Sequence, residues 1–231
     1  MKGCVFMFSK KDLQKLIVPL IIEQFLAITI GMADTVMVAS CGEAAVSGVS
    51  LVDSINILLI NIFSALATGG AIISSQYIGR EEPHHACEAA KQLVLSVFFL
   101  SALIGGVCVF GGPQILNFIY GGTEAVVMEN AKIYFFLTAL SYPFIALYNA
   151  GAALFRAMGN SKVSMIISIS MNCINVGGNA LFIFGFKMGV AGAALATLIS
   201  RIVGAILILA LLRRPVNIIH VDSYLKLLCR A

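Results

Sequence analysis

Four ionisable side chains lie inside long apolar stretches of this sequence, where a membrane or a protein core makes their charge costly. They are Glu23, Asp34, Asp53 and Arg201. Such residues are retained when they are paired, face a water-filled cavity or take part in moving ions or protons. The chemistry to look for is therefore the binding of a cation or a proton by buried carboxylates.

The first apolar stretch carries two of these acids. Glu23 and Asp34 are eleven residues apart, and at 100° per residue both carboxylates fall on one face of a helix. Pro19 lies just before them. Two interpretations of Pro19 stay open, a residue of the first helical turn or a hinge that bends the helix.

A polar stripe marks a later stretch, in which Ser168, Asn172, Asn175 and Asn179 recur at spacings of four, three and four. This spacing places all four on one helix face. Asparagine in hydrocarbon must find partners, so the stripe either joins neighbouring helices or lines a wet cavity that ions can reach. The pattern alone leaves both interpretations open.

The single intramembrane cation, Arg201, lies one helical turn after Thr197. A buried guanidinium needs an anionic partner. We interpret Arg201 as half of a structural ion pair with Glu23 or Asp53.

The elements that position these residues must be membrane helices. The composition is 60% hydrophobic and 11% charged with a mean hydropathy of +0.99, more apolar surface than one soluble core of 231 residues can bury. Six segments have the roughly 20 apolar residues that a span requires. They lie near residues 16–38, 46–77, 92–110, 131–155, 163–185 and 190–212. We therefore expect an all-α integral membrane protein, with a six-helix bundle in residues 1–212 and an amphipathic cytoplasmic tail or connection in residues 213–231.

The distribution of Lys and Arg predicts the orientation in the membrane. With the N-terminus inside, the outer side holds only Lys132 and Lys187, Arg201 lies within a span, and the other twelve of the 15 Lys and Arg residues fall on the inner side. We expect a multi-pass plasma membrane protein, in a bacterium the inner membrane, with both termini cytoplasmic. The net charge of +4 follows from this bias, so no nucleic-acid partner is predicted.

Enzyme chemistry has no motif in the chain: no nucleophile elbow, H-E-x-x-H, Walker A lysine or dinucleotide fingerprint occurs. The six cysteines form no C-x-x-C pair, so we expect neither a zinc site nor a disulfide framework. No cofactor is predicted. Intramembrane polar stripes without catalytic motifs are typical of a transporter or channel rather than an enzyme.

Four motifs, in order along the chain, carry a resemblance to a known family. They are MADTVMV at 32–38, SSQYIG at 74–79, LFRAMGN at 154–160, and FIFG at 182–185 followed by GVAGAALAT at 189–197. Together they resemble the multidrug and toxic compound extrusion (MATE) family. The resemblance implies a secondary active antiporter of two six-helix lobes, which exports organic cations and drugs by alternating access and is coupled to Na⁺ or H⁺.

The resemblance also implies site residues. The family's cation site in the N-terminal lobe corresponds here to Asp34, Asn175, Asn179 and Thr197, and Na⁺ is the metal ion that it implies. Pro19 matches the proline whose bend is linked to the transport cycle. Glu23, Asp53, Arg201 and Asn172 would form the surrounding intramembrane polar network.

Two departures from the family pattern qualify these expectations. At the position of the family's second acid, this sequence has Asn179, so the expected cation affinity of the site is lower. We hypothesise that H⁺ and Na⁺ compete for Asp34. The chain also has six expected helices where the family has about twelve. It is then a truncated fragment, a half-transporter that pairs with itself, or one that pairs with a separate six-helix lobe. A flippase for lipid-linked sugars, from the same superfamily, is the alternative activity.

Overall fold

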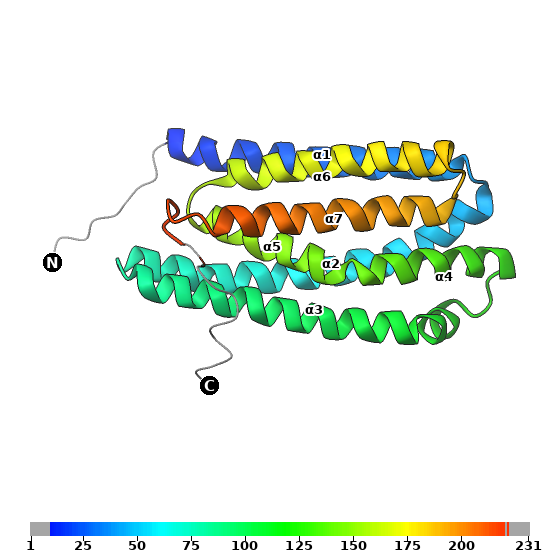
Figure 1. The fold of residues 1–231 in the computed structure, drawn as a ribbon, viewed down its shortest axis with the longest axis horizontal. Coiled ribbons are helices and arrows are strands. Elements are labelled where there is room, and N and C mark those ends of the chain that lie inside the picture. Colours follow the sequence, from blue (N-terminus) through cyan, green and yellow to red (C-terminus); the bar gives the residue numbers. More distant parts are fainter. Residues whose placement is uncertain (1–9, 220, 222–231) are drawn as a thin grey trace.

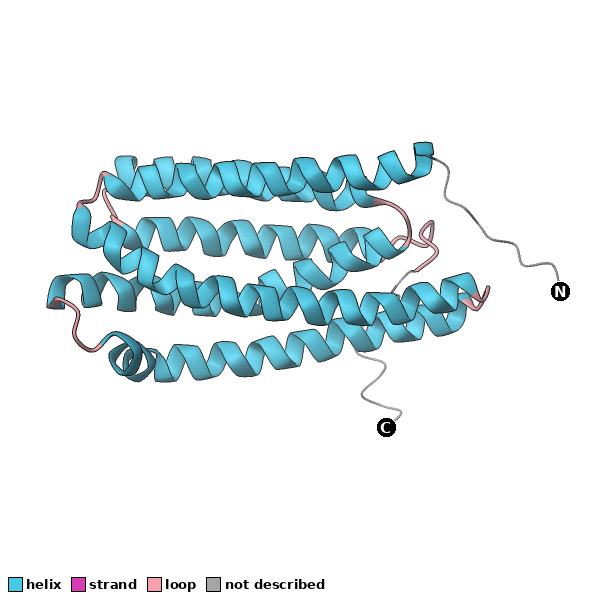
Figure 2. Ribbon diagram, turned by 180° about the vertical axis from the view of Figure 1, so that it is seen from behind, coloured by secondary structure: helices cyan, strands magenta, loops and turns pink. Residues whose placement is uncertain are grey.

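The computed structural model describes residues 10–219 and 221, and every regular element among them is helical. In chain order the elements are α1 (Lys10–Ala39), α2 (Glu43–Gly79), α3 (Pro83–Tyr120), α4 (Ala125–Leu140), α5 (Tyr142–Ala157), α6 (Ser161–Asn179), the π-helical segment η1 (Ala180–Gly185) and α7 (Val190–Leu212). They lie side by side along one long axis (Figures 1 and 2).

Five of these elements are long and apolar enough to cross a bilayer alone: α1, α2, α3, α7 and α6 continued by η1. The sixth span is the pair α4 and α5, which meet at a 46° bend. One span near residues 131–155 was expected without a break, but Pro143 in the first turn of α5 has no N–H to donate to the preceding turn. The predicted six-helix membrane bundle is confirmed, with a broken fourth span.

The ends of the spans differ from the predicted ones in two instructive places. α3 was expected over 92–110 and continues through Pro113 to Tyr120. A proline inside a span costs one backbone hydrogen bond, which a long helix tolerates when its neighbours are in place. The fifth span leaves regular α-helix directly after Asn179, where η1 begins. Such wider turns often mark functional positions in helices.

Small residues allow the central helices to approach closely. Gly204 on α7 faces Met171 of α6, and Gly151 on α5 faces Ile208 of α7, so that a side chain at either glycine would collide with its neighbour. This is the usual way in which membrane helices gain packing contacts without a hydrophobic driving force. α7 lies at the centre of the bundle, whereas α1 is peripheral and packs chiefly on α6 (Figure 1).

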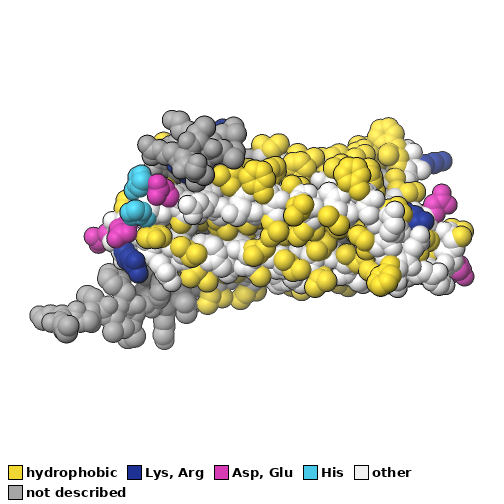
Figure 3. All heavy atoms as spheres, turned by 90° about the horizontal axis from the view of Figure 1, so that it is seen from below, with side chains coloured by type: hydrophobic (Ala, Val, Ile, Leu, Met, Phe, Trp, Pro, Cys, Tyr) yellow, Lys and Arg dark blue, Asp and Glu magenta, His cyan; other side chains and the backbone are white. Residues whose placement is uncertain are grey.

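The surface has the polarity of a membrane protein. Charged and histidine side chains gather at the two ends of the molecule, and apolar side chains cover the region between them on the face in Figure 3. Exposed apolar residues on α1 include Ile21, Phe25 and Met32. In water these would be an unfavourable patch, but lipid or a second protein can cover them.

The segment after α7 returns to the bundle. α7 ends at Leu212, and Ile219 and Val221 are fully buried. The Ile219 N–H donates to Met158 Sδ at 3.3 Å, which ties this segment to the end of α5. Residues 220 and 222–231, most of the predicted amphipathic tail, lie outside the described residues.

Candidate cation-binding site

The four residues predicted to form a cation site lie together at one place between three helices. Asp34 comes from α1, Asn175 and Asn179 from α6, and Thr197 from α7. Asn179 Nδ2 donates to Asp34 Oδ1 at 2.6 Å, and Asn175 Nδ2 lies 3.1 Å from Thr197 Oγ1. A hydrogen-bonded chain therefore runs from α1 through α6 to α7.

The local structure of each helix explains this meeting. Asn175 and Asn179 are one turn apart on α6, and both are buried in the bundle. Asp34 is half-buried near the end of α1, and Thr197 is half-buried two turns into α7. Gly178 lies beside Ala196 of α7, and a Cβ there would come within 2.9 Å of Ala196 Cβ. The missing side chain lets α6 and α7 approach at the level of the site.

The Asn175 amide group can turn either of its atoms toward Asp34. One amide atom lies 2.8 and 3.0 Å from the two Asp34 oxygens, and the other lies 3.1 Å from Thr197 Oγ1. With nitrogen toward Asp34, the amide donates to the carboxylate and accepts from Thr197. With oxygen toward Asp34, acceptors face one another, an arrangement that a cation between them would stabilise.

Asn179 carries a second sign of an oxygen-rich site. Its Oδ1 atom is buried and has no hydrogen-bond partner among the described residues, although its Nδ2 atom is bonded to Asp34. An unpartnered buried oxygen costs about 1–3 kcal/mol. The cluster thus offers carboxylate, amide and hydroxyl oxygens from four side chains, the donor set that a hard cation such as Na⁺ prefers.

Asn172 does not join this cluster. It belongs to the predicted polar stripe but is only half-buried. The hydrogen bonds of the described residues link Asp34 to Asn175, Asn179 and Thr197 and leave Asn172 out. Of the predicted stripe, Asn175 and Asn179 thus belong to the site, and Asn172 does not.

Glu23 lies in a separate polar cluster nearer the start of α1. Tyr148 Oη on α5 donates to Glu23 Oε1 at 3.1 Å, and Ser164 Oγ on α6 donates to Glu23 Oε2 at 3.2 Å. Neither partner was predicted. A tyrosine and a serine within apolar spans are common, so only the need to satisfy Glu23 could have drawn attention to them.

The predicted ion pair of Arg201 is wrong. Its guanidinium donates to Ser141 Oγ at 2.7 Å, and no carboxylate of the described residues lies within 4.0 Å of it. The bend between α4 and α5 explains this, because it places the Ser141 hydroxyl inside the bundle. Asp34 and Asp53 act on Arg201 only through longer-range electrostatic attraction. Pro143 was the one sequence signal for this bend.

Asp53 anchors a third polar group. It accepts from Asn56 Nδ2 at 3.3 Å, and Asn56 Oδ1 accepts from Tyr142 Oη at 2.7 Å. This chain joins α2 to the first residue of α5. Asn56 and Tyr142 are both almost completely buried, so the contact ties α2 to the broken span at its bend.

The MatE family profile matches residues 19–181, well over half of the chain. The chain belongs to the MatE family. The resemblance predicted from the four motifs is thereby confirmed.

Individual MatE relatives agree with this assignment. The chain is 30% identical over 204 residues to the uncharacterized transporter YisQ of Bacillus subtilis, covering 87% of this chain and 44% of YisQ. It is 28% identical over 202 residues to the probable multidrug resistance protein NorM of Thermotoga maritima, covering 85% and 43%. The chain thus spans about half the length of the curated relatives it matches.

Solved structures show the same fold. A multidrug resistance MATE family transporter of the MOP superfamily, in its outward-facing conformation, superposes with a TM-score of 0.86 at 21% identity, over 92% of this chain and 47% of that one. A MOP superfamily transporter from Pyrococcus furiosus gives the same TM-score and coverage. The bundle is therefore one lobe of a MATE-type fold.

Pro19 is the first residue of the MatE match, and the tail lies outside this match. Pro19 is buried inside α1, nine residues after Lys10, so the interpretation as a helix-start residue is wrong. The hinge interpretation stays a prediction.

Proposed function

We propose that this chain is one six-helix lobe of a cation-coupled exporter of organic cations, and that the Asp34 cluster binds the coupling ion. The observation that carries the proposal is the convergence of Asp34, Asn175, Asn179 and Thr197 from three helices. The unpartnered Asn179 oxygen supports it further. The names of the multidrug resistance relatives support export as the activity.

The Asn175 amide suggests how ion binding acts on the helices. Without a cation, its N–H donates to Asp34 and joins α1 to α6 directly. With a cation, its oxygen and the carboxylate both face the ion, and the amide N–H moves to Thr197. Ion entry then exchanges hydrogen bonds between α1, α6 and α7. This exchange is a local change that can be coupled to a movement of α1.

Asp34, the single carboxylate in the cluster, makes the proposed ion binding depend on pH. A proton on Asp34 removes the charge that attracts Na⁺, so H⁺ and Na⁺ compete and Na⁺ binding weakens as pH falls. With Asn179 in the place of the second family acid, one negative charge is lost and the affinity for Na⁺ is lower than in a two-carboxylate site.

Organic cations are the proposed substrates because acids dominate the interior. Glu23, Asp34 and Asp53 outnumber Arg201 among the intramembrane ionisable residues. A flippase for lipid-linked sugar phosphates is the alternative, and a cavity for such anions needs the opposite balance. We place the exporter in the plasma membrane with both termini cytoplasmic, in accord with the distribution of Lys and Arg.

A second six-helix lobe is the proposed protein partner. The solved transporters are about twice as long as the chain. The exposed apolar face of α1 fits a surface that lipid or another helical bundle covers. The partner is either a separate chain or a second copy of this one.

Reconstitution tests the proposal. The purified chain is reconstituted into liposomes that are loaded with a fluorescent organic cation, and a Na⁺ or H⁺ gradient is imposed. Efflux of the cation is then measured for the wild type, for Asp34→Asn and for the control Glu43→Gln. Glu43 is an exposed acid at the start of α2, near the end of α1 that carries Asp34. We expect gradient-driven efflux with wild type and Glu43→Gln and none with Asp34→Asn.

Three results would count against parts of the proposal. Unchanged ion dependence in Asp34→Asn excludes Asp34 as the coupling residue. Absence of efflux from a folded, monodisperse wild-type chain excludes self-pairing as a sufficient transporter, and leaves a separate partner lobe or the non-transporting fragment. Efflux of a fluorescent lipid-linked sugar instead of the organic cation supports the flippase.

A further inference from the structure

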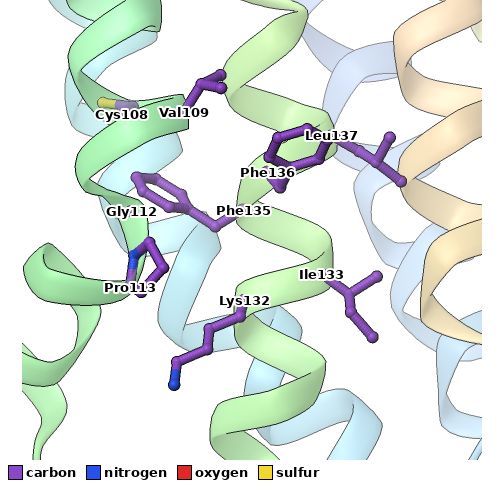
Figure 4. A pocket seen from close by; sticks show the side chains of 9 residues that line it. All are labelled: Cys108, Val109, Gly112, Pro113, Lys132, Ile133, Phe135, Phe136 and Leu137. Atoms are coloured by element: carbon purple, nitrogen blue, oxygen red, sulfur yellow. The ribbon is translucent and has the colours of Figure 1, made fainter.

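A groove between α3 and α4 lies apart from all three polar clusters. It has a volume of about 430 Å³, and its lining includes Cys108, Val109 and Phe135 (Figure 4). Its walls are almost entirely apolar. The Asp34 cluster is formed by α1, α6 and α7, so none of its residues contributes to this groove.

The backbone of α3 forms one wall of the groove. Gly112 faces the ring of Phe135, and a Cβ there would come within 3.1 Å of it. Pro113 follows, and it has no N–H to donate to the carbonyl of Val109. Gly112 thus lets the Phe135 ring of α4 pack directly on α3, and the groove lies beside this contact. Phe136 on the other wall is 50% exposed, so the groove opens toward the surrounding lipid.

One cation lies at an end of this apolar groove. Lys132 on α4 is half-buried, and no carboxylate of the described chain lies within 4.0 Å of its amine. In Figure 4 the Lys132 side chain lies at one end of the set of lining residues, and Cys108 and Leu137 lie toward the other end. It is seven residues after the start of α4, about 10 Å along the helix. From there a lysine can extend its amine to the bilayer interface.

We propose that the groove binds an acyl chain of an anionic phospholipid, whose headgroup phosphate is held by Lys132. The shape and the charge agree: an open apolar groove takes the chain, and the unpaired ammonium at the interfacial end attracts the phosphate. An acyl chain gains little by leaving other lipid, because both surroundings are apolar. Selectivity therefore comes from the headgroup, and one lysine near the surface gives about a five-fold preference for an anionic over a zwitterionic lipid.

This site is independent of the proposed transport activity. It lies on the outer wall of the bundle, and its occupancy is measured without any ion gradient. The proposal states that the groove prefers a lipid with an anionic headgroup, whereas ordinary contact with the bilayer involves no such headgroup preference.

Photo-crosslinking to the full chain tests the lipid site. Phosphatidylglycerol and phosphatidylcholine with the same diazirine-bearing acyl chain are compared in detergent, and labelled peptides are mapped by mass spectrometry. We expect labelling of residues 108–113 and 133–137, about five-fold stronger for phosphatidylglycerol. Lys132→Met should remove this preference, and Lys132→Arg should keep it.

Two further variants separate the headgroup from the groove. Lys187→Met removes an exposed cation at the same end of the bundle, in the loop before α7, and should keep the preference. Val109→Phe, or Ile133→Phe if the former does not fold, fills the groove and should reduce labelling by both lipids. Equal labelling by the two lipids, or an equal loss in Lys187→Met and Lys132→Met, would overturn the proposal. So would competition by inorganic phosphate without labelling of the groove, because Lys132 would then bind a free anion.

Discussion

Two acids on α1 lie in polar clusters of different chemistry. Asp34 meets the amides of Asn175 and Asn179, and one buried amide oxygen stays without a partner among the described residues. Glu23 meets only hydroxyls, those of Tyr148 and Ser164. Both clusters join α1 to α6, and the two acids, eleven positions apart in the helix, are separated by roughly 16 Å.

The kind of partner decides what each acid can do. Hydroxyls donate to Glu23 and satisfy both of its oxygens, and the same hydroxyls lie 3.2 and 3.0 Å from the backbone oxygens of Ser164 and Ser161. Each Glu23 oxygen thus has a hydroxyl partner, and no amide of the described residues joins this cluster. Amides offer an oxygen as readily as an N–H, so the Asp34 cluster has acceptors in excess. We therefore assign ion binding to Asp34 and a tie between helices to Glu23.

The largest expected effect is that of Asp34→Asn on Na⁺ binding. Removing the one charge that contacts the ion should weaken binding about 100-fold, whereas Glu23→Gln, much farther away, should change it about five-fold or less. Titration calorimetry of the purified variants at constant ionic strength measures both. Equal losses would show that the two clusters act as one site.

Asn179→Asp sharpens the contrast from the other direction. A second carboxylate beside Asp34 restores the charge that this sequence lacks relative to the family pattern, and should raise Na⁺ affinity about ten-fold at alkaline pH. The two carboxylates should also share a proton as pH falls, so the gain should shrink in acid. A gain that is independent of pH would argue against direct contact of residue 179 with the ion.

Thr197→Val removes one neutral oxygen while it keeps the shape of the side chain. The loss of one ligand and of the hydroxyl that meets Asn175 should lower Na⁺ affinity about five-fold. In Na⁺-free buffer, the free energy of unfolding of this variant should differ from that of the wild type by less than about 1 kcal/mol. Ser200→Ala, one turn of helix later on α7, serves as the control, because among the described residues the Ser200 hydroxyl bonds only the backbone oxygen of Thr197, at 2.8 Å.

Tyr148→Phe should have the smallest effect on ion binding, under about two-fold, and a clear effect on stability. It removes the hydroxyl that donates to Glu23, at a cost of about 1–2 kcal/mol. The thermal midpoint in detergent should fall by about 4 °C. A large loss of Na⁺ affinity without loss of stability would transfer the ionic role to the Glu23 cluster.

The sequence was most informative where spacing and chemistry agreed. Asn175 and Asn179 are one turn apart in an otherwise apolar segment, and the motif around Asp34 supplied the third member of the site. Thr197 came from the family resemblance alone. The bounds expected for α7, near 190–212, agree with the observed helix because Gly189 and Arg213 flank a mainly apolar run.

Long-range partners could not be predicted in the same way. The choice of partner for Arg201 rested on opposite charge, whereas a bend at Ser141 brought a neutral hydroxyl closer. Tyr148 and Ser164 have no local pattern that distinguishes them from other polar residues in spans. The length of α3 was missed because Pro113 is a local signal for a stop, and only neighbouring helices compensate for its missing N–H.

Thallium anomalous diffraction would test the central claim most directly. Tl⁺ is a monovalent cation that scatters strongly, and crystals of the chain soaked in it should show one intramembrane peak within about 3 Å of oxygens of the four-residue Asp34 cluster, including that of Asn175. The peak should be absent from crystals of Asp34→Asn. A peak between Glu23 and Tyr148 instead, or one that persists in Asp34→Asn, would contradict the assignment of ion binding to the Asp34 cluster.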